Sequence, residues 1–357
     1  MVKLAFGFLI ALGLAPWVFG ATPAIAADPI TIHIGTPDAS IGGAPSGGIN
    51  LTTVTVVRHL WEQEFAKDGI KVEWTFFKGA GPAINEALAN KQLDFVYLGD
   101  LAHIIGKASG LDTRYLVPTR GSNAYLVTNP DAKINGIADL KGKRVAVFRG
   151  TAYQFTFDRA LATAKLTERD MQVTNLDWNA AAAAIAAKQI DATWTNYTGF
   201  GLKEKGVATI PASSKTLGRN TTFQAGVAGR GEFIAQHPDL TERVVKVFVE
   251  AQAWLSDPAH LDEFYTTTSA VSGVPVSIGH AEYDGDDLKF RFSPRMDEFV
   301  TTGFQQDVND AKALNLIRKP FEVKDWVDGH FVDQAIKDLN LDKTWPLYDK
   351  DGKPIAG

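Results

Sequence analysis

The chain of 357 residues contains no cysteine. Disulfide scaffolds, thiolate zinc sites, cysteine nucleophiles and lipid attachment at a cysteine are therefore excluded. The excess of one sign of charge is also small, because 36 Lys and Arg residues against 41 Asp and Glu residues give a formal net charge of −5. Without a basic block or stripe, nucleic acid is not an expected partner. With 45% hydrophobic and 22% charged residues, the composition is that of a globular protein of about two domains.

Long apolar runs are rare, and the one near the N-terminus has the features of an export signal. It follows Lys3, is interrupted by Pro16 and ends in the small residues Ala24 and Ala26. A transmembrane anchor is the alternative, but the run is too short and too broken to span a bilayer. We interpret residues 1–26 as a signal peptide cleaved near Ala26, which predicts export to the periplasm.

Strand-like alternation of apolar and polar residues recurs along the chain, and most of these segments are followed by a helical pattern. Strands are expected at 30–34, 72–76, 95–98, 144–148, 172–176 and 192–195, and helices at 54–65, 82–90, 153–164, 180–187, 242–255 and 294–313. This alternation predicts α/β lobes with parallel strands joined by right-handed crossovers. The two late helices are expected to pack on the first lobe.

One segment occurs twice, which supports two similar lobes. Residues 87–94 and 184–191 are identical at five of eight positions, and two more positions exchange Leu for Ile. Each segment ends an expected helix and leads into a strand. In open α/β folds such strands end at the sheet edge where ligands bind.

No catalytic or metal-binding pattern is present. The seven histidines are scattered without a pair at ligand spacing, and the phosphate-loop and dinucleotide patterns are incomplete. We therefore predict that the protein is not an enzyme and uses no cofactor and no metal. Instead, glycine turns at 79–81, 99–101 and 150–152 each lie between a strand and a helix. Backbone N–H groups at such helix N-termini can hold a small anion.

Several of these segments resemble one known family. The matching stretches are Phe77 to Leu88, Leu93 to Asp100 and Asp139 to Val147, with later landmarks at His237 to Leu240 and at Lys319-Pro320. Over about residues 28–330 the chain resembles the periplasmic substrate-binding proteins of ABC importers for aliphatic sulfonates, taurine and nitrate.

The resemblance implies a type II periplasmic binding protein fold, in which two doubly wound α/β lobes are joined by two crossover strands. The crossings are expected near 117–120 and 222–226. Residues 28–118 and 226–357 would then form the first lobe and residues 119–225 the second, with the ligand cleft between them.

The same resemblance implies a monomer that captures a small organosulfonate, an alkanesulfonate or a taurine-like molecule, and delivers it to a membrane permease for sulfur uptake. Nitrate or a pyrimidine-type ligand, delivery to a sensor, and a biosynthetic enzyme on the same fold are the alternatives. The ligand-binding residues that it implies are Asp38, Gly79, Ala80, Gly81, Pro82, Gly99, Asp100, Arg120, Gly150, Thr151, Ala152, Asn179, Trp194, Asn196, Tyr197, Thr222 and Phe223.

Two of these residues leave alternatives open. A carboxylate beside an anion repels it, so Asp100 is expected either to contact a cationic or hydroxyl-bearing part of the ligand or to cap its own helix. Trp194 lies at the end of an expected strand, where an aromatic side chain serves a ligand and a core equally well.

Overall fold

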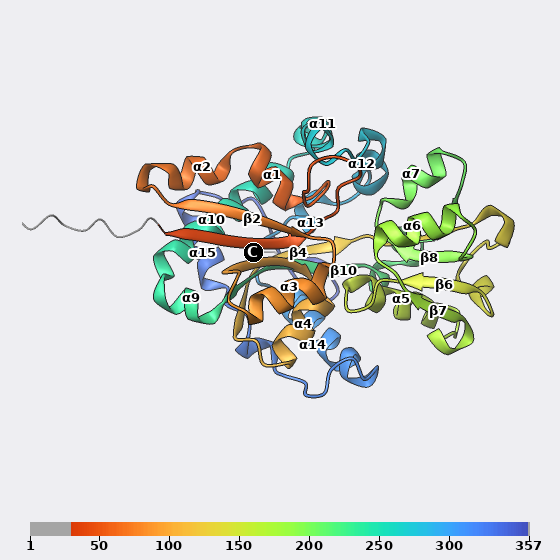
Figure 1. Cartoon of the computed structure of the whole chain (residues 1–357). Helices are drawn as coiled ribbons and strands as arrows, with labels where there is room; N and C mark the ends of the chain where they lie inside the picture. The colour runs from red at the N-terminus through yellow and green to blue at the C-terminus, as the bar shows by residue number, and fades with distance from the viewer. Residues whose placement is uncertain (1–29, 356–357) are drawn as a thin grey trace, which may run out of the picture.

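Two mixed five-stranded sheets organise the chain, whose computed structural model describes residues 30–355 (Figure 1). The first sheet has the order β2-β1-β3-β10-β4. Its strands are β1 (Thr31–Pro37), β2 (Lys71–Phe77), β3 (Phe95–Gly99), β4 (Thr113–Ser122) and β10 (Phe223–Arg230). The helices that follow its first strands are α1 (Leu51–Val57), α2 (Leu60–Phe65), α3 (Ala80–Ala89) and α4 (Asp100–Ala108). Together they form the core of the first lobe.

The second sheet repeats this plan in the order β7-β6-β8-β5-β9. Its strands are β5 (Tyr125–Thr128), β6 (Arg144–Val147), β7 (Gln172–Asn175), β8 (Ala192–Thr195) and β9 (Thr209–Ser213). Its helices are α5 (Ala152–Thr163), α6 (Trp178–Ala186), α7 (Gly199–Glu204) and α8 (Ser214–Leu217). These elements make up the second lobe, on the right of Figure 1.

The repeated segment occupies equivalent positions in the two lobes. Lys91 and Lys188 both adopt the left-handed conformation, with φ of 56° and 58°, where the preceding helix ends. One Oδ of Asp94 accepts a hydrogen bond from the His33 N–H at 3.0 Å, and one Oδ of Asp191 accepts from the Arg144 N–H at 2.8 Å. The two lobes thus build the same turn before the third strand of each sheet.

The sequence pattern predicts parallel strands, but both sheets are mixed. In each sheet the fourth strand in spatial order runs antiparallel to its neighbours: β10 against β3 and β4, and β5 against β8 and β9. Both enter their lobe from the other lobe, so their direction follows from the crossing rather than from a strand–helix–strand unit. The predicted two-lobe α/β fold with two crossings is confirmed.

The helix expected at 54–65 is broken in two. α1 ends at Val57 and α2 begins at Leu60, because His59 between them has a left-handed φ of 54°. The run of β-branched residues from Thr52 to Val57 has restricted side-chain rotamers and a low preference for helix. The other expected strands and helices are present with boundaries shifted by a few residues.

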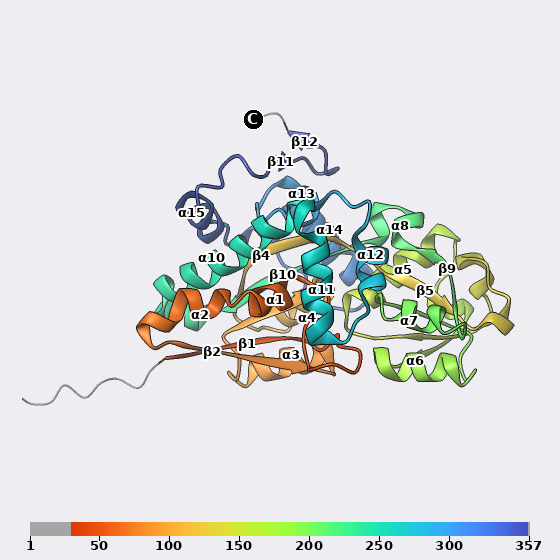
Figure 2. The same cartoon turned by 90° about the horizontal axis from the view of Figure 1, so that it is seen from above.

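The late helices pack on elements of the first lobe. α10 (Pro238–Leu255) packs on α1 and α15 (His330–Asp338), and α14 (Glu298–Ala313) packs on α4. α11 (Leu261–Ser272), α12 (Val276–Tyr283) and α13 (Leu288–Arg291) lie near the junction of the lobes in Figures 1 and 2. The remaining elements are α9 (Gly231–Gln236) and the hairpin of β11 (Leu347–Tyr348) and β12 (Pro354–Ile355).

Two findings bear on export. Among residues 30–355, no helix combines the length and the apolar character that a membrane crossing requires. The predicted signal peptide and its cleavage position lie outside the described residues.

A buried ion pair fastens the late segment to the first crossing strand. Arg120 of β4 is fully buried, and its Nη1 lies 3.0 Å from Oδ2 of Asp297. Asp297 also caps α14, where its Oδ1 accepts from the Val300 N–H. One carboxylate therefore neutralises a buried cation and starts a helix.

Substituting Asp297 by Ala is expected to lower the unfolding free energy by about 3–5 kcal/mol, because it leaves the Arg120 guanidinium buried without its counter-charge. Chemical denaturation followed by circular dichroism measures this change. The control is Asp131→Ala, which removes the exposed pair with Lys188 and is expected to cost less than about 1 kcal/mol. Equal losses in the two variants would contradict the role given to the buried pair.

Candidate ligand-binding site

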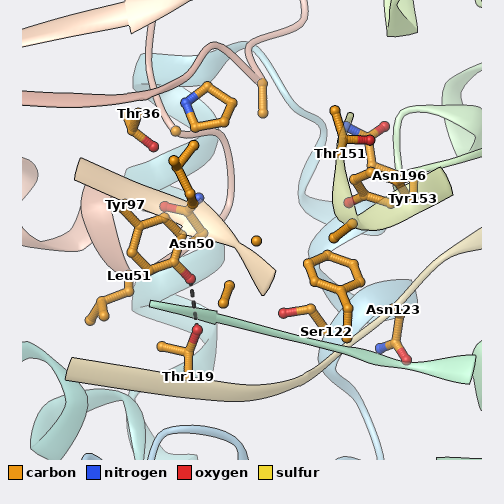
Figure 3. A pocket seen from close by; sticks show the side chains of 18 of the residues that line it. Thr36, Asn50, Leu51, Tyr97, Thr119, Ser122, Asn123, Thr151, Tyr153 and Asn196 are labelled. Carbon is orange, nitrogen blue, oxygen red and sulfur yellow. Dashed lines mark hydrogen bonds between the residues drawn. The ribbon is translucent and has the colours of Figure 1, made fainter. Parts of the chain in front are cut away.

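A cavity of about 120 Å³ lies between the lobes and is lined from both sides (Figure 3). A cavity of about 150 Å³ is enough to hold benzene, so this one has room for a ligand of a few heavy atoms. The first lobe contributes Thr36, Asn50, Leu51, Ala80, Gly81, Tyr97 and Thr119, and the second contributes Asn123, Thr151, Ala152, Tyr153, Trp178, Asn196 and Tyr197. A molecule bound here therefore contacts both lobes.

Two helix N-termini, one from each lobe, meet at this cavity. A Cβ built on Gly81 at the start of α3 would lie 3.0 Å from the carbonyl oxygen of Gly150, and one built on Gly99 would lie 2.6 Å from Cβ of Ala152 at the start of α5. These close approaches require glycine at positions 81 and 99. Gly81 thus brings the start of α3 close to the turn before α5, and Gly99, which precedes α4, brings the start of α4 close to α5.

Neither helix has a side chain that caps its N-terminus. Gly79 precedes α3 and has no side chain, and Thr151 precedes α5 but donates its hydroxyl to the carbonyl of Phe148 at 2.6 Å. The first-turn N–H groups of a helix have no partner within the helix and carry its positive dipole end. Both helices therefore leave donors available for a ligand.

Three buried side-chain donors of residues that line the cavity also lack a partner. They are the indole Nε1 of Trp178, the hydroxyl of Thr36 and the Nε of Arg120, which have no hydrogen-bond partner among the residues that the structure describes. Burying an unpaired polar group costs about 1–3 kcal/mol, so such groups are rare unless a ligand satisfies them. The Trp178 indole and the Thr36 hydroxyl can donate to an acceptor placed in the cavity.

Tyrosine hydroxyls from both lobes surround the same space. The hydroxyls of Tyr97 and Thr119 are 2.9 Å apart (Figure 3). The Tyr197 hydroxyl, from the second lobe, accepts from the Ile49 N–H of the first lobe at 3.1 Å. Burial raises the pKa values of Tyr97 and Tyr153 above the ordinary 10.0. The phenols therefore remain neutral and can donate hydrogen bonds.

One wall of the cavity carries a buried ion pair. Oε1 of Glu282 lies 2.5 Å from Nη2 of Arg291, and both residues line the cavity. Glu282 also accepts from Nδ2 of Asn123 at 3.3 Å and from the hydroxyl of Tyr125, which both belong to the second lobe. Arg120 also lines the cavity, but its guanidinium pairs with Asp297. The three charged residues of the lining are thus already paired.

The structure brings about half of the predicted site residues to this cavity. Those that line it are Ala80, Gly81, Gly99, Arg120, Thr151, Ala152, Asn196, Tyr197 and Phe223. Those that do not line it are Asp38, Gly79, Pro82, Asp100, Gly150, Asn179, Trp194 and Thr222. Gly79, Pro82, Gly150 and Asn179 are chain neighbours of lining residues.

The other residues outside the lining have partners of their own. Asp38 accepts from the N–H and hydroxyl of Ser40 within its own loop. The Thr222 hydroxyl donates to the Arg219 carbonyl at 2.7 Å. Trp194 is 1% exposed, packs in the core of the second lobe and donates its indole N–H to the hydroxyl of Thr156 at 2.9 Å. Of the two roles considered for Trp194, the structure favours the core.

Asp100 is directed away from the cavity. Its carboxylate accepts from the N–H groups of Leu101 at 2.6 Å and Gln224 at 3.1 Å, so it ties the start of α4 to β10. Burial, together with the charge of Asp307, raises the pKa of Asp100 well above its ordinary value of 3.8. Of the two roles considered for it, the geometry supports the capping of its own helix.

The sequence analysis missed several lining residues. Trp178 stands next to the predicted Asn179, and Tyr97 lies within a family stretch that was used as a landmark. Tyr153 follows the third glycine turn, so its position was also available as a signal. Glu282 and Arg291 come from the late helices, which no motif marks as part of a site.

Comparisons with known proteins agree on one family. Residues 65–260 match the family model described as NMT1/THI5 like. A Bacillus subtilis protein whose name describes it as an aliphatic sulfonates-binding protein is 28% identical over 287 residues, covering 78% of this chain and 82% of that protein. An Escherichia coli protein of the same name is 30% identical over 251 residues, covering 69% of this chain and 74% of that protein.

A solved structure gives the same result. The chain matches a protein from Methylobacillus flagellatus KT, described as a periplasmic sulfonate-binding protein of a sulfonate ABC transporter, with a TM-score of 0.75 and 28% identity. The match covers 90% of this chain and 98% of that one, so both lobes are shared.

Thr36→Val is expected to raise the unfolding free energy of the ligand-free protein by about 1 kcal/mol, because it removes a buried hydroxyl without a partner and keeps the shape. The control is Thr55→Val. Thr55 is equally buried, but its hydroxyl donates to the Thr52 carbonyl and accepts from Trp61, so this variant is expected to be less stable than the wild type. Urea denaturation of both variants measures the difference, and a loss for Thr36→Val would contradict an unsatisfied hydroxyl.

Asp100→Asn is expected to change the pH dependence of stability. The folded wild-type protein holds the Asp100 proton more tightly than its unfolded chain. The stability that this proton contributes is fully present below the ordinary pKa of 3.8 and is lost as the pH rises through the raised pKa of the folded protein. The asparagine variant mimics the neutral carboxyl, so the amount by which its unfolding free energy exceeds that of the wild type is expected to grow with pH. Denaturation across a pH series measures this advantage, and a difference that does not vary with pH would contradict the shift.

Proposed function

Because the chain belongs to the NMT1/THI5-like family, we propose that it is the periplasmic solute-binding component of an ABC importer and that its ligand is a small organosulfonate. The relatives whose names describe sulfonate binding support the ligand class. The chemistry of the cavity supports it independently.

The observation that carries the proposal is a surplus of hydrogen-bond donors. The two uncapped N-termini of α3 and α5, the indole of Trp178 and the hydroxyl of Thr36 all face or line one cavity. A sulfonate is a permanent anion with three acceptor oxygens and no donor, so it complements such a set. The helix dipoles supply the positive potential that the paired Arg120 and Arg291 do not.

Contacts from both lobes give the ligand a mechanical effect. Because α3 belongs to the first lobe and α5 to the second, an anion held by both stabilises the closed arrangement over an open one. The closed pair of lobes would then present one continuous surface to the membrane permease.

Nitrate also offers three acceptor oxygens, and the lining argues against it as the preferred ligand. Tyr97, Trp178 and Phe223 give the cavity aromatic surface that nitrate, without a carbon skeleton, leaves uncovered. A short organosulfonate fills both the polar and the apolar part.

Isothermal titration with ethanesulfonate, nitrate and sulfate tests the ligand class. Ethanesulfonate is expected to bind at micromolar concentration or tighter, and the two inorganic anions at least about tenfold more weakly. Recovery of unchanged ethanesulfonate after incubation separates binding from turnover. Binding of nitrate or sulfate in the absence of any sulfonate binding would overturn the proposal.

Trp178→Phe keeps the aromatic ring and removes the donor. Since a hydrogen bond to a charged group contributes about 1.5–3 kcal/mol, the affinity for ethanesulfonate is expected to fall at least about tenfold. Trp194→Phe is the matched control, because its indole bonds to Thr156 in the core. Trp194→Phe is expected to lower stability and leave the affinity for ethanesulfonate unchanged. A loss of affinity in Trp194→Phe but not in Trp178→Phe would contradict the role of Trp178 as the ligand donor.

A further inference from the structure

The cavity contains a carboxylate that an anion site does not need. Glu282 lies on α12 with 3% of its surface exposed and lines the cavity that the proposed function assigns to a sulfonate. We propose that Glu282 determines specificity by receiving a hydrogen-bond donor, an ammonium or a hydroxyl group, carried on the carbon skeleton of the sulfonate. This inference rests on the proposed function and narrows its ligand class.

The carboxylate is held in a fixed orientation with capacity to spare. Oε1 accepts from Arg291 at 2.5 Å and from Asn123 at 3.3 Å, while Oε2 accepts from the Tyr125 hydroxyl. A carboxylate can accept about four hydrogen bonds. Within the described residues three are made, so Oε2 can accept one more from a ligand.

The charges around Glu282 cancel. Nζ of Lys215 lies 3.2 Å from Oδ1 of Asp286, which also pairs with Arg291. Two cations, Arg291 and Lys215, thus stand against two carboxylates, Glu282 and Asp286. The group provides no net attraction for an anion, and Glu282 is its carboxylate in the cavity wall.

This balance distinguishes between sulfonates. A plain alkanesulfonate places an apolar tail next to a buried carboxylate, so the free lone pair of Oε2 stays unpaired, and it adds one negative charge to a wall that offers no net positive charge. A ligand with an ammonium group keeps the cavity neutral, and one with a hydroxyl group pairs the free lone pair of Oε2.

The aromatic lining favours the same ligands. The faces of tyrosine and tryptophan rings attract a cation, and Tyr97, Tyr153, Tyr283 and Trp178 surround the cavity. The guanidinium carbon of Arg291 already lies 4.1 Å from the centre of the Tyr283 ring, so one such ring holds a cation here.

Glu282 also belongs to the contacts that join the lobes. α12 packs on α11, which packs on α1 of the first lobe, and the Tyr283 hydroxyl of α12 donates to the Ile49 carbonyl, whereas Asn123 and Tyr125 belong to the second lobe. Nearby, the Ser277 hydroxyl of α12 donates to Glu204 of α7 at 2.6 Å. A ligand group bonded to Glu282 is therefore recognised at the contact that forms when the lobes close.

Three probes of similar size test the inference in the wild-type protein: 2-aminoethanesulfonate, 2-hydroxyethanesulfonate and propanesulfonate. At least one of the first two is expected to bind about tenfold more tightly than propanesulfonate, which replaces the donor by a methyl group. This comparison needs no variant, so it does not depend on whether a substitution folds.

Glu282→Gln then assigns the preference to the residue. The variant is expected to lose about tenfold in affinity for the preferred probe and to bind propanesulfonate as well as, or better than, the wild type. Asp286→Asn is the control, because it removes a partner of Arg291 that does not line the cavity, and the preference is expected to persist. Melting temperatures of both variants report folding.

The outcomes separate the two proposals. Propanesulfonate binding as tightly as both donor-bearing probes overturns the role of Glu282 and leaves the proposed function intact. An equal loss for all probes in Glu282→Gln also overturns it, because that pattern belongs to a structural residue. If no sulfonate binds to the wild type, the proposed function fails, and this inference fails with it.

Discussion

An anion bound in the cavity between the lobes, as proposed, would have to be held without a spare cation. Arg291 pairs with Glu282 and Asp286, and Arg120 pairs with Asp297, so the guanidinium groups at the cavity are already neutralised. An anion can then be held only by dipoles and neutral donors, which must be fixed before it arrives because a buried donor without a partner is costly. In the proposed site these donors are the N-termini of α3 and α5 and the indole of Trp178.

The duplicated lobe plan explains how the donors come together. In each sheet the order of the first three parallel strands is the same, and the first residues of α3 and of α5 line the same cavity. The crossing strands β4 and β10 pair with each other and so set the relation of the lobes. Gly81 leaves room for the turn before α5 beside the start of α3, and Gly99 leaves room for Ala152 of α5 beside the start of α4. Two further contacts join the lobes at the cavity: the Tyr197 hydroxyl accepts from the Ile49 N–H, and Glu282 accepts from Asn123 and Tyr125.

The fold and the helix starts could be predicted from the sequence because both depend on patterns within short segments of the chain. Strand–helix alternation and the repeat at 87–94 and 184–191 predicted two similar lobes, and the glycine turns predicted helix starts, of which those of α3 and α5 line the cavity. The roles of several side chains could be assigned only from the structure. Trp178 and Trp194 both carry an indole N–H donor, and the packing shows that the Trp194 indole donates to Thr156 whereas the Trp178 indole has no partner among the described residues. Glu282 reaches the cavity from a helix far along the chain, and Asp100, although it stands in a predicted turn, points to β10.

Nuclear magnetic resonance on the protein during titration with ethanesulfonate tests most directly whether donors from both lobes hold the anion. The Trp178 indole and the Gly81 and Ala152 amide protons are expected to move downfield together as they bond to sulfonate oxygens, while the Trp194 indole keeps its position because Thr156 remains its partner. A saturating titration in which the Trp178 indole and both amides stay in place would contradict the central claim that donors from both lobes hold the anion.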